Sequence, residues 1–264
     1  MKIRLPAIIR FLILTGTPLF GESIPLVIRH GRPMVEGVYI NGQGPYRFLL
    51  DTGSQTNVLE PRLAQAIGLE AKSGVKVVTP AGAAPAHLVR EVNIRLGSAQ
   101  ASKQELLLIP LEYAAQEVGP IQGILGQEFL SRFDYLLALR RRTIEFGKQE
   151  RSGLRVEFDA SDGRPAIKTS LGKLVLDSGV NRLVLFDLEP DRHGSPLFMK
   201  TTCGLLTAGT ASGRRLVIGS RVILRRTTAV AVPHSADSSV DGLLPTNLFQ
   251  AIYVSNSEGY VVFE

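Results

Sequence analysis

Two short segments of the 264-residue chain place a carboxylic acid, a hydroxyl and a glycine directly after an apolar run. They are "FLLDTGS", which contains Asp51, and "LVLDSGV", which contains Asp177. A single D-T-G is typical of an ordinary turn, because Asp, Thr and Gly all favour turns. A carboxylate at the end of a buried strand is costly, however, unless it is paired or hydrogen-bonded. Two such acids that meet could act together, one as general base and the other as general acid.

The two acids occupy corresponding positions of an internal repeat. Three further landmarks recur in the same order in both halves of the chain. They are the pairs "QGILGQEFL" and "DGLLPTNLF", "TIEF" and "YVVF", and, more weakly, "TPAG" (79–82) and "TAGT" (207–210). Self-similarity of this kind indicates a duplicated structural unit. We therefore expect two units of roughly 115 to 125 residues each.

Strand-like segments dominate the sequence. Short runs rich in Val, Ile and Leu alternate with Gly, Pro, Asn or Ser, and this pattern predicts a mostly β protein. Only "PRLAQAIG" (61–68) and the stretch after Gly126 are predicted to be helical, and both are short. The repeat divides the chain into an N-terminal lobe of residues 24–149 and a C-terminal lobe of residues 150–264.

Residues 1–23 have the outline of a secretory signal. Lys2, Arg4 and Arg10 precede a short apolar stretch, and the small residues Gly21 and Ser23 follow it. The apolar stretch is too short for a convincing spanning helix. We expect an exported protein, periplasmic or secreted, whose N-terminal segment is either removed or retained as a membrane anchor.

The apolar frame around Asp51, the later I-L-G element and the second D-S-G together resemble retropepsin-like aspartic peptidases, as in the bacterial aspartyl protease family. Two such units in one chain resemble the two-lobed pepsin plan. The resemblance implies an acid-protease-type β-barrel fold with two lobes and short helices. It also implies an endopeptidase in which Asp51 and Asp177 activate a water molecule to cut a polypeptide substrate, without a cofactor or a metal. Because like charges in close contact cannot both ionise, the pair would share one proton.

The same resemblance assigns supporting roles around the acids. Thr52 and Ser178 would bond to the backbone of the opposite loop, Gly53 and Gly179 would let main chain approach the acids, and Ser54 would hydrogen-bond the first acid. The residues expected to pack beneath the acids are Gly123, Ile124, Leu125, Gly126, Gly242, Leu243 and Leu244. The residues expected to cover the substrate as a hairpin are Thr79, Pro80, Ala81 and Gly82, with "TAGT" as their counterpart.

The chain departs from the family pattern at several positions, two of them in the second half. Val180 stands where a hydroxyl follows the first D-T-G, Pro245 replaces the glycine found at Gly126, and Gln55 sits where a small residue is frequent. Two alternatives therefore stay open beside a monomer with both acids in one chain. The first is an inactive relative that binds peptides or serves as a scaffold. The second is a peptidase that is active only as a homodimer through two copies of Asp51.

The charge distribution and the potential metal ligands limit the other kinds of function that the sequence supports. The chain has a net charge of +6, and its basic residues are spread along the sequence apart from the run Arg140–Arg142. This even spread argues against nucleic-acid binding. A basic surface also attracts anionic membrane lipids or acidic substrates, and we expect association with a membrane surface on this ground. The four histidines show no metal-ligand spacing, and the single Cys203 is expected to be a small buried apolar residue.

Overall fold

The computed structural model describes residues 22–79, 82–194, 196–201, 204–233 and 239–264. Most of the segment 1–23, together with Pro80, Ala81 and Cys203, lies outside the described residues. The described chain is mostly β and forms two sheets with three short α-helices, in agreement with the predicted fold class. No helix among these residues is long and apolar enough to cross a membrane.

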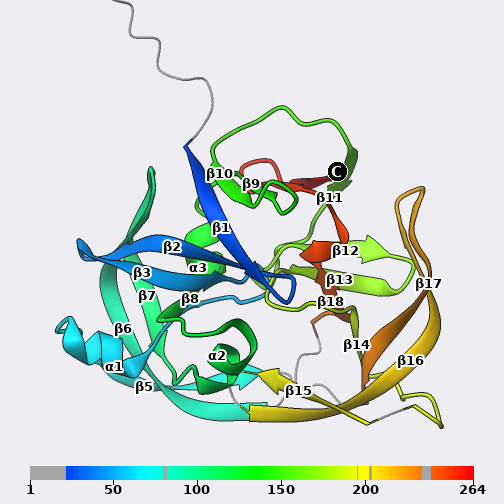
Figure 1. Cartoon of the computed structure of the whole chain (residues 1–264), viewed down its shortest axis with the longest axis horizontal. Helices are drawn as coiled ribbons and strands as arrows, with labels where there is room; N and C mark the ends of the chain where they lie inside the picture. The colour runs from blue at the N-terminus through cyan, green and yellow to red at the C-terminus, as the bar shows by residue number, and fades with distance from the viewer. Residues whose placement is uncertain (1–21, 80–81, 195, 202–203, 234–238) are drawn as a thin grey trace, which may run out of the picture.

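The N-terminal lobe occupies the left of Figure 1 and runs from blue to green. Its strands are β1 (Ser23–Arg29), β2 (Arg32–Ile40), β3 (Gln43–Leu50), β4 (Asn57–Leu59), β5 (Ser73–Thr79), β6 (Gly82–Leu96), β7 (Ala99–Leu108), β8 (Gly123–Leu125), β9 (Tyr135–Ala138) and β10 (Thr143–Phe146). Its helices are α1 (Pro61–Ala66), α2 (Glu112–Val118) and α3 (Gln127–Leu130).

Helix α2 corrects the expectation that only two segments are helical. Of its seven residues only Val118 is buried, so the sequence carries no apolar stripe of helical period. Gly119 ends the helix at a φ of +83°, a conformation that glycine adopts without strain. The helix depends on its contacts with the lobe, which sequence periodicity does not report.

The described residues of the C-terminal lobe form the remaining strands and one 3₁₀ turn. Its strands are β11 (Leu154–Glu157), β12 (Ala166–Thr169), β13 (Gly172–Asp177), β14 (Val184–Phe186), β15 (Leu197–Thr201), β16 (Gly204–Ile218), β17 (Arg221–Val232), β18 (Gly242–Pro245), β19 (Ile252–Ser255) and β20 (Tyr260–Phe263). The 3₁₀ turn is η1 (Thr246–Leu248).

Both lobes arrange seven strands in the same spatial order. The order is β2-β3-β8-β4-β7-β6-β5 in the N-terminal lobe and β12-β13-β18-β14-β17-β16-β15 in the C-terminal lobe. In each lobe, the strand that leads to the acid pairs in parallel with a strand from the end of the unit, β3 with β8 and β13 with β18. The segments that carry Asp51 and Asp177 therefore occupy equivalent positions.

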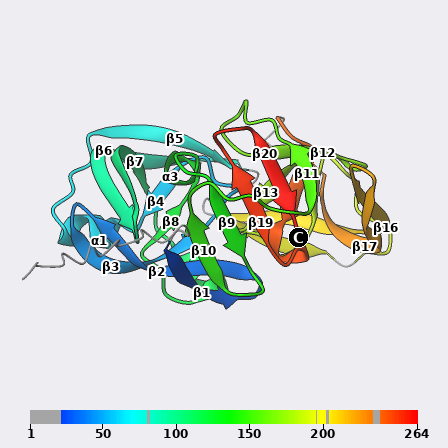
Figure 2. The ribbon, with the colours of Figure 1, turned by 90° about the horizontal axis from the view of Figure 1, so that it is seen from above.

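A shared antiparallel sheet joins the two lobes. It contains β1, β10 and β9 from the N-terminal lobe and β19, β20 and β11 from the C-terminal lobe. Strands β9 and β19 pair across the boundary, where Leu136 lies opposite Tyr253 and both side chains are buried. Figure 1 places this sheet at the top of the molecule and β5 and β15 at the bottom, and Figure 2 shows β9, β10, β19 and β20 between the lobes.

One continuous apolar core extends through both lobes. It includes Phe48 and Leu50 beneath the first acid and Leu174 and Leu176 beneath the second, and all four side chains are buried. Because close-packed interiors resist small displacements, this core fixes the position of one lobe against the other. The ends of β3 and β13 are held at the lobe boundary as a result.

Candidate active site

Each acid follows directly from a buried strand end. Strand β3 ends with three consecutive buried residues before the half-buried Asp51, and β13 ends with three buried residues followed by the buried Asp177. The backbone N–H of Asp51 donates to the carbonyl of Leu125 over 3.0 Å. The strand pairings of the two lobes thus deliver both carboxyl groups to one place between the lobes.

Four reciprocal bonds lock the two acid loops, Asp51–Ser54 and Asp177–Val180, to each other. The Thr52 hydroxyl donates to the carbonyl of Leu176 over 2.7 Å, and the Ser178 hydroxyl donates to the carbonyl of Leu50 over 2.6 Å. Each hydroxyl also accepts the backbone N–H of the other residue, at 3.0 Å in both cases. We call these four contacts the reciprocal hydroxyl bonds. Both side chains are buried, so removing one hydroxyl would leave its two partners without a hydrogen bond and without water to replace it.

The glycine of each loop faces the acid of the other. A Cβ on Gly179 would lie 2.6 Å from Oδ2 of Asp51, and a Cβ on Gly53 would overlap the carboxyl group of Asp177. Neither glycine has a positive φ, so the requirement is for space and not for backbone freedom. The structure therefore brings together both acids and the four neighbours Thr52, Gly53, Ser178 and Gly179.

Backbone N–H groups solvate both carboxyl groups. Oδ1 of Asp51 accepts from the N–H of Gly53 over 3.0 Å. Oδ1 of Asp177 accepts from the N–H groups of Gly179 and Val180 over 2.7 and 3.1 Å. Val180 therefore supports its acid through the main chain, whatever side chain it carries.

The expected bond from the Ser54 hydroxyl to Asp51 is wrong. That hydroxyl donates to the carbonyl of Thr56 over 2.9 Å, and Ser54 acts on Asp51 through its backbone N–H instead. A serine hydroxyl has one proton to donate, and here the carbonyl two residues further on receives it. The two loops are therefore more alike in their support of the acids than the Ser54 and Val180 side chains suggest.

Burial and mutual repulsion set the protonation of the pair. Burial raises the pKa of Asp177 well above its ordinary value, and the neighbouring Asp51 charge raises it further. Burial also raises the pKa of Asp51, but the N–H of Gly53, the hydrogen bond with Asp177, the N–H of Ser54 and the charge of Arg32 oppose the rise. The two carboxyl groups are hydrogen-bonded to each other, and the pair holds a single shared proton.

Arg32 is a site residue that the sequence reasoning missed. Its Nε donates to the carbonyl of Gly179 over 2.6 Å, and its Nη1 lies 3.5 Å from Oε2 of Glu117. The side chain is largely buried, so its charge acts on Asp51 with little screening by water. Arg32 opens β2 after the turn of the β1–β2 hairpin, and only the tertiary fold brings that turn to the opposite acid loop.

The residues of the N-terminal lobe that were expected to pack beneath the acids form strand β8 and the residue before α3. Gly123 pairs with Phe48, whose ring fills the space that a Cβ on the glycine would need. Gly126 lies against the backbone of the first acid loop, where a Cβ would be 2.8 Å from the carbonyl oxygen of Ser54. Gln127, also missed from the sequence, donates from Nε2 to the carbonyl of Thr52 over 2.8 Å.

The C-terminal lobe uses different residues for the same support. In strand β18, Gly242 pairs with Leu174, Leu243 with Val175 and Leu244 with Leu176. Pro245 pairs with Asp177 itself, at the position where Gly126 begins α3 in the other lobe. The 3₁₀ turn η1 follows in place of an α-helix.

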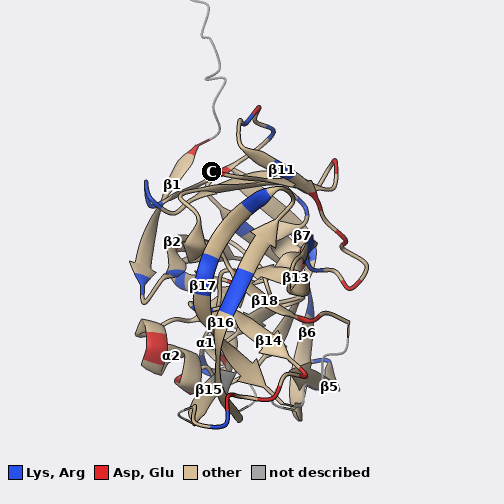
Figure 3. Ribbon diagram, turned by 90° about the vertical axis from the view of Figure 1, so that its right-hand side faces the viewer, with Lys and Arg blue, Asp and Glu red and all other residues tan. Residues whose placement is uncertain are grey.

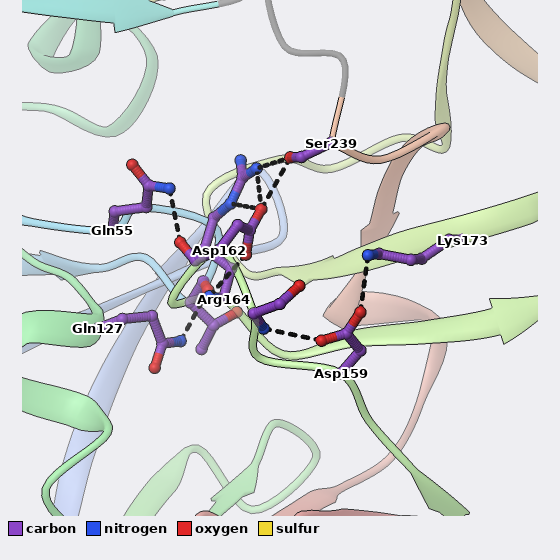
Figure 4. Close-up of polar contacts among 9 residues, drawn as sticks. Gln55, Gln127, Asp159, Asp162, Arg164, Lys173 and Ser239 are labelled. Atoms are coloured by element: carbon purple, nitrogen blue, oxygen red, sulfur yellow. Dashed lines mark hydrogen bonds and ion pairs between the residues drawn. The ribbon is translucent and has the colours of Figure 1, made fainter.

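Gln55 connects the first acid loop to the C-terminal lobe. Its Nε2 donates to the carbonyl of Asp162 over 2.6 Å, and Figure 4 shows this side chain reaching the loop between β11 and β12. Within that loop Asp162 binds the backbone N–H and the guanidinium of Arg164 and accepts from the hydroxyl of Ser239. The long amide at position 55, unusual for the family pattern, therefore contributes a contact between the lobes.

Two hairpins occupy equivalent positions at the edges of the two lobes. Strands β5 and β6 close with Thr79 opposite Gly82, and β15 and β16 close with Thr201 opposite Gly204. The expected counterpart "TAGT" is wrong, because Thr207 pairs with Phe198 within the body of the second hairpin. Similarity of sequence selects "TAGT", whereas strand register selects Thr201–Gly204.

The comparison with known families finds a match within the N-terminal lobe only. Residues 37–129 match the aspartyl protease family model, which confirms the resemblance over the segment that contains Asp51 and Gly126. Asp177 lies outside the matched residues. No curated protein matches the chain. The match supports a peptide-hydrolysing enzyme in general terms.

We expect Ser178→Ala to destabilise the protein by about 2–4 kcal/mol, because it leaves the carbonyl of Leu50 and the N–H of Thr52 buried without a partner. Urea unfolding measures the loss. The control is Ser102→Ala, which removes an exposed hydroxyl. A loss no larger than that of the control would contradict the role of the reciprocal hydroxyl bonds.

We expect Asp177→Asn to raise the melting temperature at neutral pH. Folding raises the pKa of Asp177, so above pH 3.8 the folded protein keeps a proton that the unfolded chain releases. The free energy of unfolding therefore falls as the pH rises from 3.8 toward the raised pKa of Asp177. The gain from Asn should shrink below pH 3.8. The measurement is Tm against pH for both proteins, and a gain that is larger at pH 3 than at pH 7 would contradict the assignment. Asp159→Asn should show the opposite sign, because the hydrogen bond from Lys173 lowers the pKa of Asp159 to about 2.

Proposed function

We propose that the protein is an aspartic endopeptidase that hydrolyses peptide bonds with water activated between Asp51 and Asp177. The observation that carries the proposal is the placement of both acids in one hydrogen-bonded site, held by the four reciprocal hydroxyl bonds. The family match over residues 37–129 supports the same chemistry. Asp177 would complete the site within the chain, so the active form is a monomer.

We assign the role of base to Asp51, because the charge of Arg32 and the N–H groups of Gly53 and Ser54 favour its ionised form. Asp51, the ionised member, takes a proton from water as the oxygen adds to the peptide carbonyl carbon. Asp177, the protonated member, donates its proton to the carbonyl oxygen. The resulting tetrahedral diol collapses when its C–N bond breaks: the proton held by Asp51 passes to the leaving nitrogen, and Asp177 takes a proton from one diol hydroxyl as the new C=O bond forms, which restores the starting state of the pair. No cofactor is needed in this scheme, because water and two carboxyl groups supply all the transfers.

The β5–β6 and β15–β16 hairpins are suited to cover an extended peptide. Val78 is 60% exposed and Phe198 is 69% exposed, so each hairpin presents apolar surface to a ligand. Exposed apolar surface of this kind is typical of binding sites. A polypeptide enclosed between the hairpins and the acid loops would be separated from bulk water during the reaction.

Asparagine substitutions test catalysis against binding alone. Asp51→Asn and Asp177→Asn should each lower kcat/KM on an unfolded protein substrate by at least about a hundredfold, because each removes one of the proton-transferring groups. The exposed acid Glu70 offers a control, and Glu70→Gln should retain activity. Activity that survives both changes would exclude the proposed mechanism, and peptide binding without cleavage by the native chain would identify an inactive binder.

A mixing experiment with the same two variants tests the homodimer alternative. A dimer built on two copies of Asp51 would leave Asp177→Asn fully active. With both acids supplied by one chain, each variant is inactive alone and an equimolar mixture remains inactive. Full activity of Asp177→Asn would therefore overturn the assignment of the second acid.

Arg32 provides a test through the pH profile. The active form holds one proton, so kcat/KM follows a bell between two apparent pKa values of the pair. The Arg32 charge favours the ionised form of Asp51, and Arg32→Met should move the acid limb of the bell to higher pH. Arg32→Lys keeps the charge and should return the limb toward its original position. Profiles on one fluorogenic peptide measure the shift, and an unmoved limb in Arg32→Met would contradict this role.

A further inference from the structure

One hairpin of the C-terminal lobe carries positive charge without any acidic residue in its own sequence. Strands β16 and β17 and their turn (204–232) contain five arginines and no acidic residue. The equivalent hairpin of the N-terminal lobe, β6–β7 (82–108), balances Arg90, Arg95 and Lys103 against Glu91 and Glu105. Because the two hairpins occupy the same place in the strand order, the fold itself does not require the arginines.

Four of these arginines form an exposed set, which we call the arginine face: Arg215, Arg221, Arg225 and Arg226. None of the four makes an ion pair within the residues that the structure describes, whereas nine ion pairs occur elsewhere in those residues. The fifth, Arg214, is half-buried and acts on Asp191. Like charges gathered on one hairpin repel each other, and an anionic partner would relieve that repulsion.

The arginine face lies away from the candidate active site. The acid loops follow the ends of β3 and β13 at the boundary between the lobes, whereas β16 and β17 lie on the right-hand outer side of the C-terminal lobe in Figure 1. Figure 3 shows the basic positions of β16 and β17 on the outer side of the lobe, with β15 and β5 at the bottom. A partner bound there would leave the acid loops accessible.

The chemistry of this face favours phospholipid headgroups over nucleic acid. Residues 204–232 contain no aromatic side chain on which a base of a single strand could stack. Guanidinium groups bind phosphate through paired hydrogen bonds, and basic clusters of this kind bind the anionic surface of membranes. Val222, which is 40% exposed beside Arg221, adds an apolar contact suited to the boundary between headgroups and acyl chains.

We propose that the arginine face binds an anionic phospholipid surface and holds the protein there with its candidate active site accessible. The basic and apolar pattern of residues 1–23 points independently to a membrane encounter during export. Each arginine near an anionic surface strengthens binding about fivefold, so three of them together contribute about a hundredfold at low salt. The attraction weakens as the salt concentration rises.

Vesicle cosedimentation with the full chain tests the proposal. Vesicles of phosphatidylcholine alone are compared with vesicles that also contain phosphatidylglycerol, at low and physiological salt. We expect binding to the anionic vesicles, and we expect R221Q/R225Q/R226Q to weaken it about a hundredfold. The matched control R62Q/K72Q/K103Q removes the same charge from exposed positions of the N-terminal lobe and should change binding only a few-fold. The neutral vesicles report binding through residues 1–23, which every variant retains.

Three results would overturn the proposal. The first is equal binding to neutral and anionic vesicles, and the second is an equal loss in the control variant, which would indicate an effect of net charge alone. The third is tight binding of single- or double-stranded DNA, lost in R221Q/R225Q/R226Q, together with no binding to the anionic vesicles. None of these readouts uses peptide hydrolysis, so the outcome is independent of the proposed enzymatic function.

Discussion

The structure depends on two carboxyl groups that share one buried site and one proton. Asp51 and Asp177 would repel each other as a doubly charged pair, and burial raises the cost of that state further. The surrounding contacts are those that such a pair requires. The glycines leave space for the opposite acid, backbone N–H groups solvate the charge, and the buried hydroxyls of Thr52 and Ser178 prevent the loops from separating.

A nearly symmetric scaffold carries an asymmetric distribution of charge. Strand register makes Arg32 and Arg164 equivalent. Leu49, two residues before Asp51, pairs with Met34, and Arg32 lies two residues before Met34. Val175, two residues before Asp177, pairs with Ala166, and Arg164 lies two residues before Ala166. Arg32 reaches across to the carbonyl of Gly179, whereas the Nε of Arg164 binds Asp162 in its own loop. The charge of Arg32 therefore favours ionisation of Asp51. Symmetry places the two acids, and the departures from symmetry give them different surroundings.

The outer strands show how a repeated fold acquires different surfaces. The β6–β7 and β16–β17 hairpins have the same position in their sheets, but only the second presents four exposed arginines without acidic neighbours in its own sequence. Side chains on the outer side of a sheet contribute little to the core, so they can change without cost to the fold. Such positions are available for contacts that the candidate active site does not make.

The sequence by itself determined the mostly β class, the two acids and the hydroxyl and glycine that follow each of them, because these features depend on residue type and local period. It did not reveal α2, whose apolar contacts follow no helical stripe, or the true counterpart of Thr79–Gly82, which is set by strand register. Tertiary structure alone brought Arg32 and Gln127 to the acid loops. It also turned the Ser54 hydroxyl away from Asp51 toward Thr56. These contacts join segments that are distant in the chain or select one of several local hydrogen-bond partners, and spacing along a sequence reports neither.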